Sequence, residues 1–238
     1  KTWLLLGHES EIPNTGDFVV RDMAEDNVIV ARGVDGGVNV SLNVCPHRGM
    51  RVCLGEAGNK RVHQCIYHGW AFKPNGDFIG APIEKEKMHG NNVDKATLNL
   101  KKARVHLYGG LIFATWNIDG PSFDEYLGDI KYYMDQLFCR TDNGLELLGP
   151  PQRFMVPCNW KVVAEAFMES QHAPTTHPQI MTHVTDVNSQ YDLFSDYVSR
   201  QISASAEPSP LLDRETVSEQ RILDDMTSRR YKIYSDVK

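Results

Sequence analysis

The sequence of 238 residues contains no long apolar run. Its longest stretches, such as Trp3–Leu6 and Leu111–Ala114, fall far short of the roughly 20 residues that cross a bilayer. It also has no basic excess, since 25 Lys and Arg face 31 Asp and Glu and give a formal charge of −6. Repeats and low-complexity tracts are missing, and a composition of 41% hydrophobic and 24% charged residues is typical of a globular protein. These absences exclude membrane-spanning, nucleic-acid-wrapping and fibrous classes.

The start of the chain lacks two further features. Lys1-Thr2-Trp3 does not have the charged-then-apolar pattern of a signal peptide, and there is no initiator Met. We therefore expect a cytoplasmic protein whose chain begins partway into a longer polypeptide. Five cysteines, an odd number, argue against a disulfide framework in that compartment. What stands out instead is the combination of these cysteines with nine histidines.

Two short motifs pair a cysteine with a histidine. Cys45-Pro46-His47 is followed, after 17 residues, by Cys65-Ile66-Tyr67-His68. Two thiolates and two imidazoles fit either a tetrahedral structural zinc site or a [2Fe-2S] cluster with two Cys on one iron and two His on the other. Zinc fingers usually group their cysteines together and their histidines together. Here each motif mixes the two types, which favours the cluster.

The longer motifs Cys45-Pro46-His47-Arg48-Gly49 and Cys65-Ile66-Tyr67-His68-Gly69-Trp70 resemble the two loops of a Rieske iron–sulfur domain. The resemblance implies that Cys45 and Cys65 hold one iron and that His47 and His68 hold the other. Cys53 and His63 lie between the motifs and are interpreted as a packed thiol and an exposed imidazole.

The residues around these motifs predict short strands joined by tight turns. Such a pattern is typical of a small antiparallel β domain, whose rigid strands hold ligand-bearing loops near solvent. The predicted hairpins pair Val28–Ala31 with Val38–Val44, Trp70–Lys73 with Asp77–Ile79, and Ala103–Tyr108 with Leu111–Trp116.

The pattern changes from strand to helix period after Gly120-Pro121. Ser122 and Glu125 form a capping-box signature, and an apolar stripe at helical spacing follows and predicts core packing. The stripe consists of Phe123, Tyr126, Leu127, Ile130, Tyr133, Met134 and Leu137. We therefore predict two domains, residues 1–118 and 119–238.

A second candidate site lies in the C-terminal half. Residues 145–156 contain strand-like apolar stretches, and a helix is predicted from the N-cap Asn159 to about Ala173, where Pro174 disfavours helical geometry. Glu165, Glu169 and His172 then share one face of the helix, opposite an apolar face of Trp160, Val163 and Phe167. His177 follows just past the helix end. Two imidazoles beside a carboxylate suit an iron(II) site with open positions for O2 and substrate.

The stretch from Asn159-Trp160-Lys161 through Glu165 and Glu169 to His172 and His177 resembles the mononuclear-iron motif of Rieske non-haem iron aromatic ring-hydroxylating oxygenases, α-subunit family. The resemblance implies an α+β fold class, with an antiparallel all-β Rieske domain followed by part of a helix-on-antiparallel-sheet catalytic domain.

The resemblance also implies residue roles. His172 and His177 would bind the mononuclear iron, and Glu169 would link the two metal centres through a Rieske histidine of a neighbouring subunit. Many members have Asp at that position, one methylene shorter than Glu. Glu165 belongs to the motif as well, although pairing with Lys161 at i−4 explains it equally well. The third ligand in the family is an Asp far downstream, so we expect it beyond Lys238.

The activity implied is that of a terminal oxygenase that receives electrons from NAD(P)H through a separate reductase, and often a ferredoxin. It would hydroxylate a small aromatic substrate with O2, as a homotrimer or as an α3β3 assembly with a small β subunit. A monooxygenase or demethylase on the same scaffold, a Rieske-type electron carrier and a zinc-stabilised binding module remain as alternatives.

Overall fold

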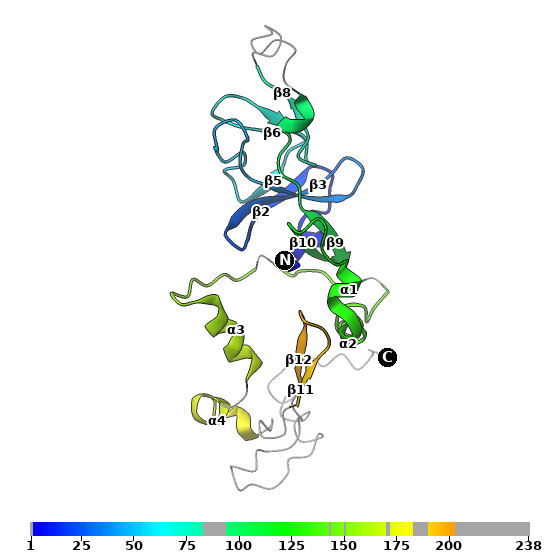
Figure 1. Ribbon diagram of the computed structural model, residues 1–238, viewed down its shortest axis with the longest axis vertical. Helices are drawn as coiled ribbons and strands as arrows, with labels where there is room; N and C mark the ends of the chain where they lie inside the picture. Colours follow the sequence, from blue (N-terminus) through cyan, green and yellow to red (C-terminus); the bar gives the residue numbers. More distant parts are fainter. Residues whose placement is uncertain are drawn as a thin grey trace. The chain divides into compact units, whose positions relative to one another are not determined.

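The hairpin of strands β2 (Asp17–Met23) and β3 (Asp26–Arg32) organises the N-terminal half of the chain. The computed structural model describes residues 2–82, 94–142, 144–149, 151–169, 172–182 and 190–202. Strands β4 (Val38–Leu42) and β5 (Ala57–Asn59) extend the hairpin to an antiparallel sheet with the order β4-β3-β2-β5 (Figure 1). The predicted hairpin of residues 28–31 and 38–44 is confirmed as β3 and β4.

Strand β3 is buried on both faces because its alternate residues enter two separate cores. Val28 and Val30 belong to the first core, and Ile29 and Ala31 belong to the second. The first core comprises Leu6, Ile12, Val19, Met23, Val28, Val30, Val40, Ile112 and Ala114. The second comprises Phe18, Ile29, Ala31, Cys45, Val52, Cys53, Cys65, Phe72 and Leu100. Cys45 and Cys65, the cysteines of the two predicted ligand loops, therefore lie in the second core.

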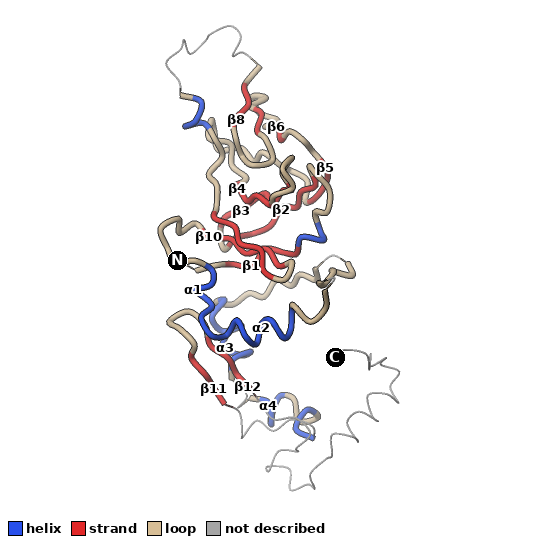
Figure 2. The backbone as a smooth tube through the Cα atoms, turned by 90° about the vertical axis from the view of Figure 1, so that its right-hand side faces the viewer, coloured by secondary structure: helices blue, strands red, loops and turns tan. Residues whose placement is uncertain are grey.

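The first core is closed by a three-stranded sheet of order β1-β10-β9. Its strands are β1 (Leu4–His8), β10 (Leu111–Thr115) and β9 (Arg104–Tyr108), and the predicted β9–β10 hairpin is confirmed. Figure 2 shows this sheet and the four-stranded sheet stacked one on the other. The second core packs against the opposite face of the four-stranded sheet.

The second core packs against a small sheet of order β6-β7-β8. The strands are β6 (His63–Gln64), β7 (Ala71–Phe72) and β8 (Phe78–Gly80), and β7–β8 confirms the third predicted hairpin. Short 3-10 helices occur at η1 (Glu9–Glu11) and η3 (Lys95–Leu98). Because β6 and β7 are neighbours, the residues between them form a closed loop that starts and ends in one sheet.

The helical region after residue 120 begins as predicted. The Ser122 Oγ accepts a hydrogen bond from the Glu125 N–H, and the Glu125 carboxylate accepts one from the Ser122 N–H. The predicted single helix is divided into α1 (Phe123–Leu127), η4 (Gly128–Ile130) and α2 (Lys131–Phe138), with Gly128 at a φ of +56°. Phe123 and Leu127 are buried, but Tyr133 and Leu137 are exposed, so the core interpretation of the stripe is wrong at its C-terminal end.

The chain divides into two compact units, Lys1–Tyr126 with Tyr133–Pro150 and Leu127–Tyr132 with Pro151–Lys238. The domain boundary near residue 118 stays a prediction. The described part of the second unit contains α3 (Trp160–Met168), α4 (Ala173–Thr176), η5 (Ile180–Thr182) and the antiparallel pair β11 (Gln190–Leu193) and β12 (Ser199–Ile202). The predicted α+β class with antiparallel sheets and few helices is confirmed.

Two predictions for the C-terminal half are wrong. Residues 144–149 and 151–156 form no strand. Helix α3 ends at Met168 instead of Ala173, and Pro174 lies in the first turn of α4, where a missing N–H is tolerated. The apolar face of Trp160, Val163 and Phe167 is exposed, as is Glu165. Within the described ranges no helix is long and apolar enough to span a membrane.

The buried Asn43 side chain gives a test of the second core. Asn43 is fully buried, accepts hydrogen bonds from the N–H groups of Val52 and Cys53, and donates to the Cys53 carbonyl and to the Asn27 side chain. Asn43→Ala should lower the free energy of unfolding by about 3 kcal/mol in a denaturant titration, because buried polar partners are left unsatisfied. The exposed Asn59 is the matched control, and Asn59→Ala should change the same free energy by less than about 1 kcal/mol. Equal effects would contradict this account.

Candidate metal centres

The first ligand loop begins directly after β4. The Cys45 N–H donates to the Met50 carbonyl at 2.8 Å, and the Gly49 N–H donates back to the Cys45 carbonyl at 2.9 Å. Gly49 has a φ of +73°, the left-handed region that glycine adopts without strain. The loop is therefore closed on itself, with its cysteine at the base and His47 near its tip.

The second ligand loop repeats this geometry between β6 and β7. The Cys65 N–H donates to the Trp70 carbonyl at 2.8 Å, the Gly69 N–H donates to the Cys65 carbonyl at 2.9 Å, and Gly69 has a φ of +69°. A Cβ on Gly69 would lie 2.6 Å from the Pro82 ring, whereas a Cβ on Gly49 would meet nothing within 4 Å. Two different motifs, Cys-x-His and Cys-x-x-His, thus share one loop conformation.

The four predicted ligands are brought together in pairs. Cys45 and Cys65 are both buried in the second core, with at most 2% of their surface exposed. The His47 and His68 rings lie 4.5 Å apart between centroids, with His47 half-buried and His68 exposed. The donor set therefore fits a cluster with its cysteine-bound iron toward the core and its histidine-bound iron toward the surface.

The pKa of the Cys45 thiol is raised, mainly by burial and further by the neighbouring Cys65 thiol. Hydrogen bonds from the backbone of His47 and Arg48 act in the opposite direction. A coordinating thiol is deprotonated by its metal, so an iron held by Cys45 and Cys65 would supply the positive charge that the two buried thiolates need. No disulfide joins the two cysteines.

Aromatic side chains hold the two imidazoles. The Trp70 ring stacks on His47 with centroids 4.8 Å apart and an interplanar angle of 4°, and Trp70 in turn packs on Phe78 at 4.9 Å. Tyr67 packs on His68 at 3.9 Å. No role was predicted for Trp70 or Tyr67 from the sequence. Their positions in the second motif could have indicated one, because Tyr67 precedes the predicted ligand His68 and Trp70 follows the loop-closing Gly69.

Cys53 and His63 form a hydrogen-bonded pair, with Sγ and Nδ1 3.0 Å apart. The packed thiol is confirmed, but the prediction of an exposed imidazole is wrong, because His63 is 1% exposed and lies edge-on to Phe18. Burial raises the pKa of Cys53 to about 11 and lowers that of His63 to about 4. Both groups are therefore neutral near pH 7.

The second candidate site lies between α3 and η5. Glu169 ends α3 in an extended conformation, and its carboxylate accepts hydrogen bonds from the His172 backbone N–H, at 3.2 Å, and from the His172 Nδ1. The ring centroids of His172 and His177 are 5.5 Å apart. The two histidines flank α4 at its N-terminal and C-terminal caps. Glu169 and His172 are thus close together, but not on one helix face as predicted, because α3 ends at Met168.

Within the described residues, no three His, Cys, Asp or Glu side chains surround a single ion position. The first site needs only two protein ligands for each iron, so this is the expected arrangement there. In the second site, His172 and His177 would supply two ligands. None of the aspartates that follow them has a spacing that marks it as the third ligand. Asp192 is engaged by Arg200, Asp196 is exposed, and Asp186, Asp213, Asp224 and Asp225 lie outside the described residues. In the same part of the chain no ion pair joins Glu165 to Lys161, whose ammonium lies 5.9 Å from the Trp160 ring.

Two family models match the chain. The model described as "Rieske [2Fe-2S] domain" matches residues 2–102, and the model described as "Ring hydroxylating alpha subunit (catalytic domain)" matches residues 123–234. The first match contains all four residues of the paired loops, and the second contains Glu169, His172 and His177.

The chain is also similar to named α subunits and to a solved dioxygenase structure. The chain is 46% identical over 177 residues to the chlorobenzene dioxygenase subunit alpha of Cupriavidus sp. (strain PS12), covering 74% of this chain and 39% of the relative. It is 42% identical over 178 residues to the N,N-dimethyl phenylurea N-demethylase subunit alpha of Sphingobium sp. (strain YBL2), covering 74% and 39%. The solved structure of naphthalene 1,2-dioxygenase from Rhodococcus sp. bound to indole aligns with a TM-score of 0.70 and 41% identity, over 76% of this chain and 41% of that chain. The chain spans about two fifths of the length of the curated relatives it matches.

The two loop glycines give a matched test of the loop geometry. Gly49→Ala should lower the free energy of unfolding by about 1 kcal/mol through its positive φ alone. Gly69→Ala should lower it by more, because the added methyl group also clashes with the Pro82 ring. We expect Gly69→Ala to retain clearly less iron and sulfide per chain than Gly49→Ala. Equal retention in the two variants would show that the second loop is not packed as described.

Proposed function

The chain belongs to the family of ring-hydroxylating oxygenase α subunits that combine a Rieske [2Fe-2S] domain with a catalytic domain, and we propose that it acts as the terminal oxygenase component of such a system. The observation that carries the proposal is the presence of two separate donor sets in one chain. Cys45, His47, Cys65 and His68 form the first set, and His172 and His177 with Glu169 form the second.

The first donor set would hold the [2Fe-2S] cluster, with Cys45 and Cys65 on one iron and His47 and His68 on the other. The second set would hold an iron(II) ion through His172 and His177, with further ligands from outside the described residues. When bound, the cluster supplies single electrons, and the mononuclear iron supplies the site at which O2 is activated. The protein supplies ligand orientation and electron delivery.

Glu169 has an orienting role in this proposal. Its carboxylate accepts the hydrogen bond from the His172 Nδ1–H, which fixes the tautomer and leaves the Nε2 lone pair of His172 for the metal. A carboxylate behind a ligand histidine also makes the imidazole more basic. As the family resemblance implies, Glu169 would in addition connect the second site to a Rieske histidine of a neighbouring subunit. The family assembly would then be a homotrimer or an α3β3 complex.

The exposed face of the first site suits electron entry or exit. His68 is exposed and His47 is half-buried, so the iron that they would hold would be the one more accessible to solvent or to a partner. Histidine ligation places Rieske potentials at about −150 to +300 mV, above those of plant-type ferredoxins. We therefore propose a supply of electrons from NAD(P)H through a reductase, with or without a ferredoxin.

The substrate class proposed is a small aromatic compound. The names of the chlorobenzene and naphthalene relatives favour dioxygenation of an aromatic ring. In the second unit, Phe167, Met168 and Tyr191 line a cavity of about 300 Å³ together with Ser199, Arg200 and Gln201. Aromatic and thioether groups pack well against a flat apolar ring. A demethylase outcome on the same scaffold is the second candidate, because one relative of 42% identity carries that name.

The metal content with an absorption spectrum separates the remaining functions. For the purified full-length protein we expect a brown colour, two cluster irons with sulfide, and one further iron per chain. A protein with cluster iron alone would be an electron carrier instead. A colourless protein with zinc would be a binding module, and either result would contradict the proposal.

His172→Ala should separate the two sites. Loss of one ligand should abolish product formation from a panel of small aromatic compounds and remove the additional iron, while the cluster spectrum is unchanged. Product is measured by chromatography with the reductase partners present. If the cluster spectrum is lost in His172→Ala, the assignment of two independent sites is wrong.

Glu169→Gln tests the orienting role of the carboxylate. The variant keeps a hydrogen-bond acceptor and should weaken iron binding by about 10-fold to 100-fold without removing it.

A further inference from the structure

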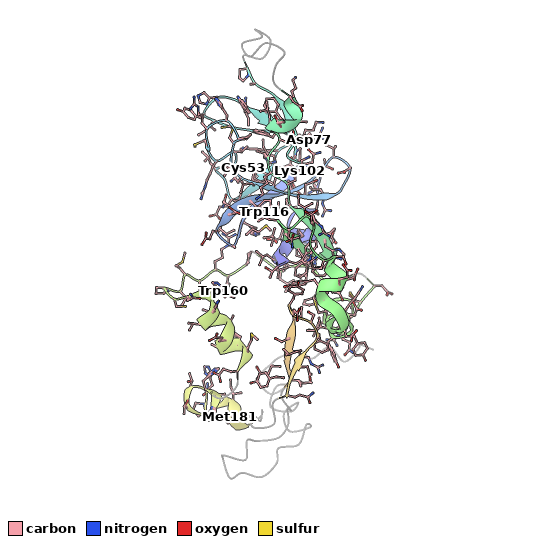
Figure 3. All side chains as sticks on the ribbon, viewed as in Figure 1. Cys53, Asp77, Lys102, Trp116, Trp160 and Met181 are labelled. Carbon is pink, nitrogen blue, oxygen red and sulfur yellow. The ribbon has the colours of Figure 1, made fainter. Side chains whose placement is uncertain are left out.

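A polar pair, Cys53 and His63, is buried beside the predicted cluster ligands. Cys53 is 3% exposed and His63 is 1% exposed, and their hydrogen bond spans 3.0 Å. Cys53 belongs to the same core as Cys45 and Cys65 (Figure 3, Cys53 labelled). Neither residue of the pair is among the ligands proposed above, so their burial has to be explained separately.

The pair connects the bases of the two ligand loops. Cys53 is fastened to the start of the first loop, because its N–H donates to the Asn43 Oδ1 at 2.8 Å and its carbonyl accepts from the Asn43 Nδ2 at 2.8 Å. His63 lies in β6 and pairs with Phe72 of β7, the two strands that carry the second loop. The side-chain hydrogen bond between Cys53 and His63 is thus a direct polar link between the two loop bases.

Packing alone does not account for this link. Removing a thiol and an imidazole from water is unfavourable, and an apolar pair of similar shape fills a core without unsatisfied polar atoms. The His63 Nε2 is buried and has no hydrogen-bond partner in the described part of the chain, so the pair is not even fully satisfied. The hydrogen bond therefore stabilises the core less than apolar packing would. Unlike apolar packing, it is directional, and it restricts the distance and orientation between the two segments that it joins.

We propose that the Cys53–His63 hydrogen bond is a positioning pair that holds the two ligand loops in register around the cluster. The inference rests on the proposed assignment of Cys45, His47, Cys65 and His68 as cluster ligands. Loss of the cluster requires one loop to move away from the other. Removing the link should therefore raise the population in which the loops have separated, and it should change the geometry of the iron ligands in the closed state.

Two substitutions of Cys53 separate positioning from packing. Cys53→Val fills the space with apolar atoms but cannot form the hydrogen bond, whereas Cys53→Ser keeps a hydroxyl that can bond to Nδ1. His63→Phe keeps an aromatic ring but removes the Nδ1 atom that shares the hydrogen bond with Cys53. If the pair serves only packing, Cys53→Val should retain the cluster better than Cys53→Ser. If the pair positions the loops, Cys53→Ser should retain it better than Cys53→Val.

Two quantities are measured. The first is the rate of iron release to a chelator below the melting temperature, and the second is the electron paramagnetic resonance spectrum of the reduced cluster. We expect iron release about five-fold faster in Cys53→Val and in His63→Phe, the change expected for one net hydrogen bond, with shifted g-values. Cys53→Ser should stay within about two-fold of the unsubstituted protein. The double variant Cys53→Val/His63→Phe should be no faster than either single variant, since both remove one link.

Ile29→Val is the matched control, because Ile29 belongs to the same core and lies in the sheet, outside both loops. It should lower the melting temperature and leave the g-values unchanged. Cys53→Val with normal iron release and g-values, or Ile29→Val with the same spectral shift, would overturn the positioning role. Should Cys53→Val fail to fold, His63→Phe decides by the same criteria. An unsubstituted protein without a Rieske spectrum would overturn the ligand assignment itself, and the pair proposal with it.

Discussion

Four donor atoms on two separate loops must meet at one place, and the structure of the first unit follows from this requirement. Strand β3 is buried on both faces, which leaves one face of its sheet for the first core and the other for the cysteine-containing core. The two loops close with the same pair of backbone hydrogen bonds, at Cys45 and at Cys65. Short loops of this kind place a buried thiol and a more exposed imidazole a fixed distance apart, so rigid strands determine the ligand geometry.

The two candidate sites solve the ligand problem differently. In the first unit each loop is closed by its own backbone, and aromatic rings such as Trp70 hold the imidazoles from the side. In the second unit Glu169 ends α3 in an extended conformation, His172 and His177 flank α4, and the Glu169 carboxylate accepts a hydrogen bond from the His172 ring. A cluster that only transfers electrons needs no open coordination position, whereas an iron that meets O2 and substrate does. Two neighbouring histidines without a third candidate ligand around the same position, among the described residues, are consistent with the second requirement.

Much of this arrangement could be predicted from the sequence, because the signals involved are local. The two Cys/His motifs, the turn residues of the hairpins and the Ser122–Glu125 capping box each lie within a few residues, and the structure confirms the hairpins and the cap. Features set by distant contacts were missed. The burial of His63 depends on its pairing with β7 and its contact with Phe18. The early end of helix α3 was missed for another reason. The Glu169 side chain accepts a hydrogen bond from the His172 N–H, a local bond that competes with the helix and that the position of Pro174 does not indicate. Residues 145–156 have strand-like composition, but β structure needs a partner strand, which they lack among the described residues.

In the proposed cluster, each of two mixed loops gives one cysteine and one histidine, so that each iron receives a pair of identical ligands. Electron–nuclear double resonance on the reduced protein, labelled with ¹⁵N-histidine only, tests this arrangement. We expect coupling of the reduced iron to two histidine nitrogens, both lost together with the cluster spectrum when His47 and His68 are replaced. A cluster spectrum without ¹⁵N coupling, or with coupling that persists in the doubly substituted protein, would contradict it.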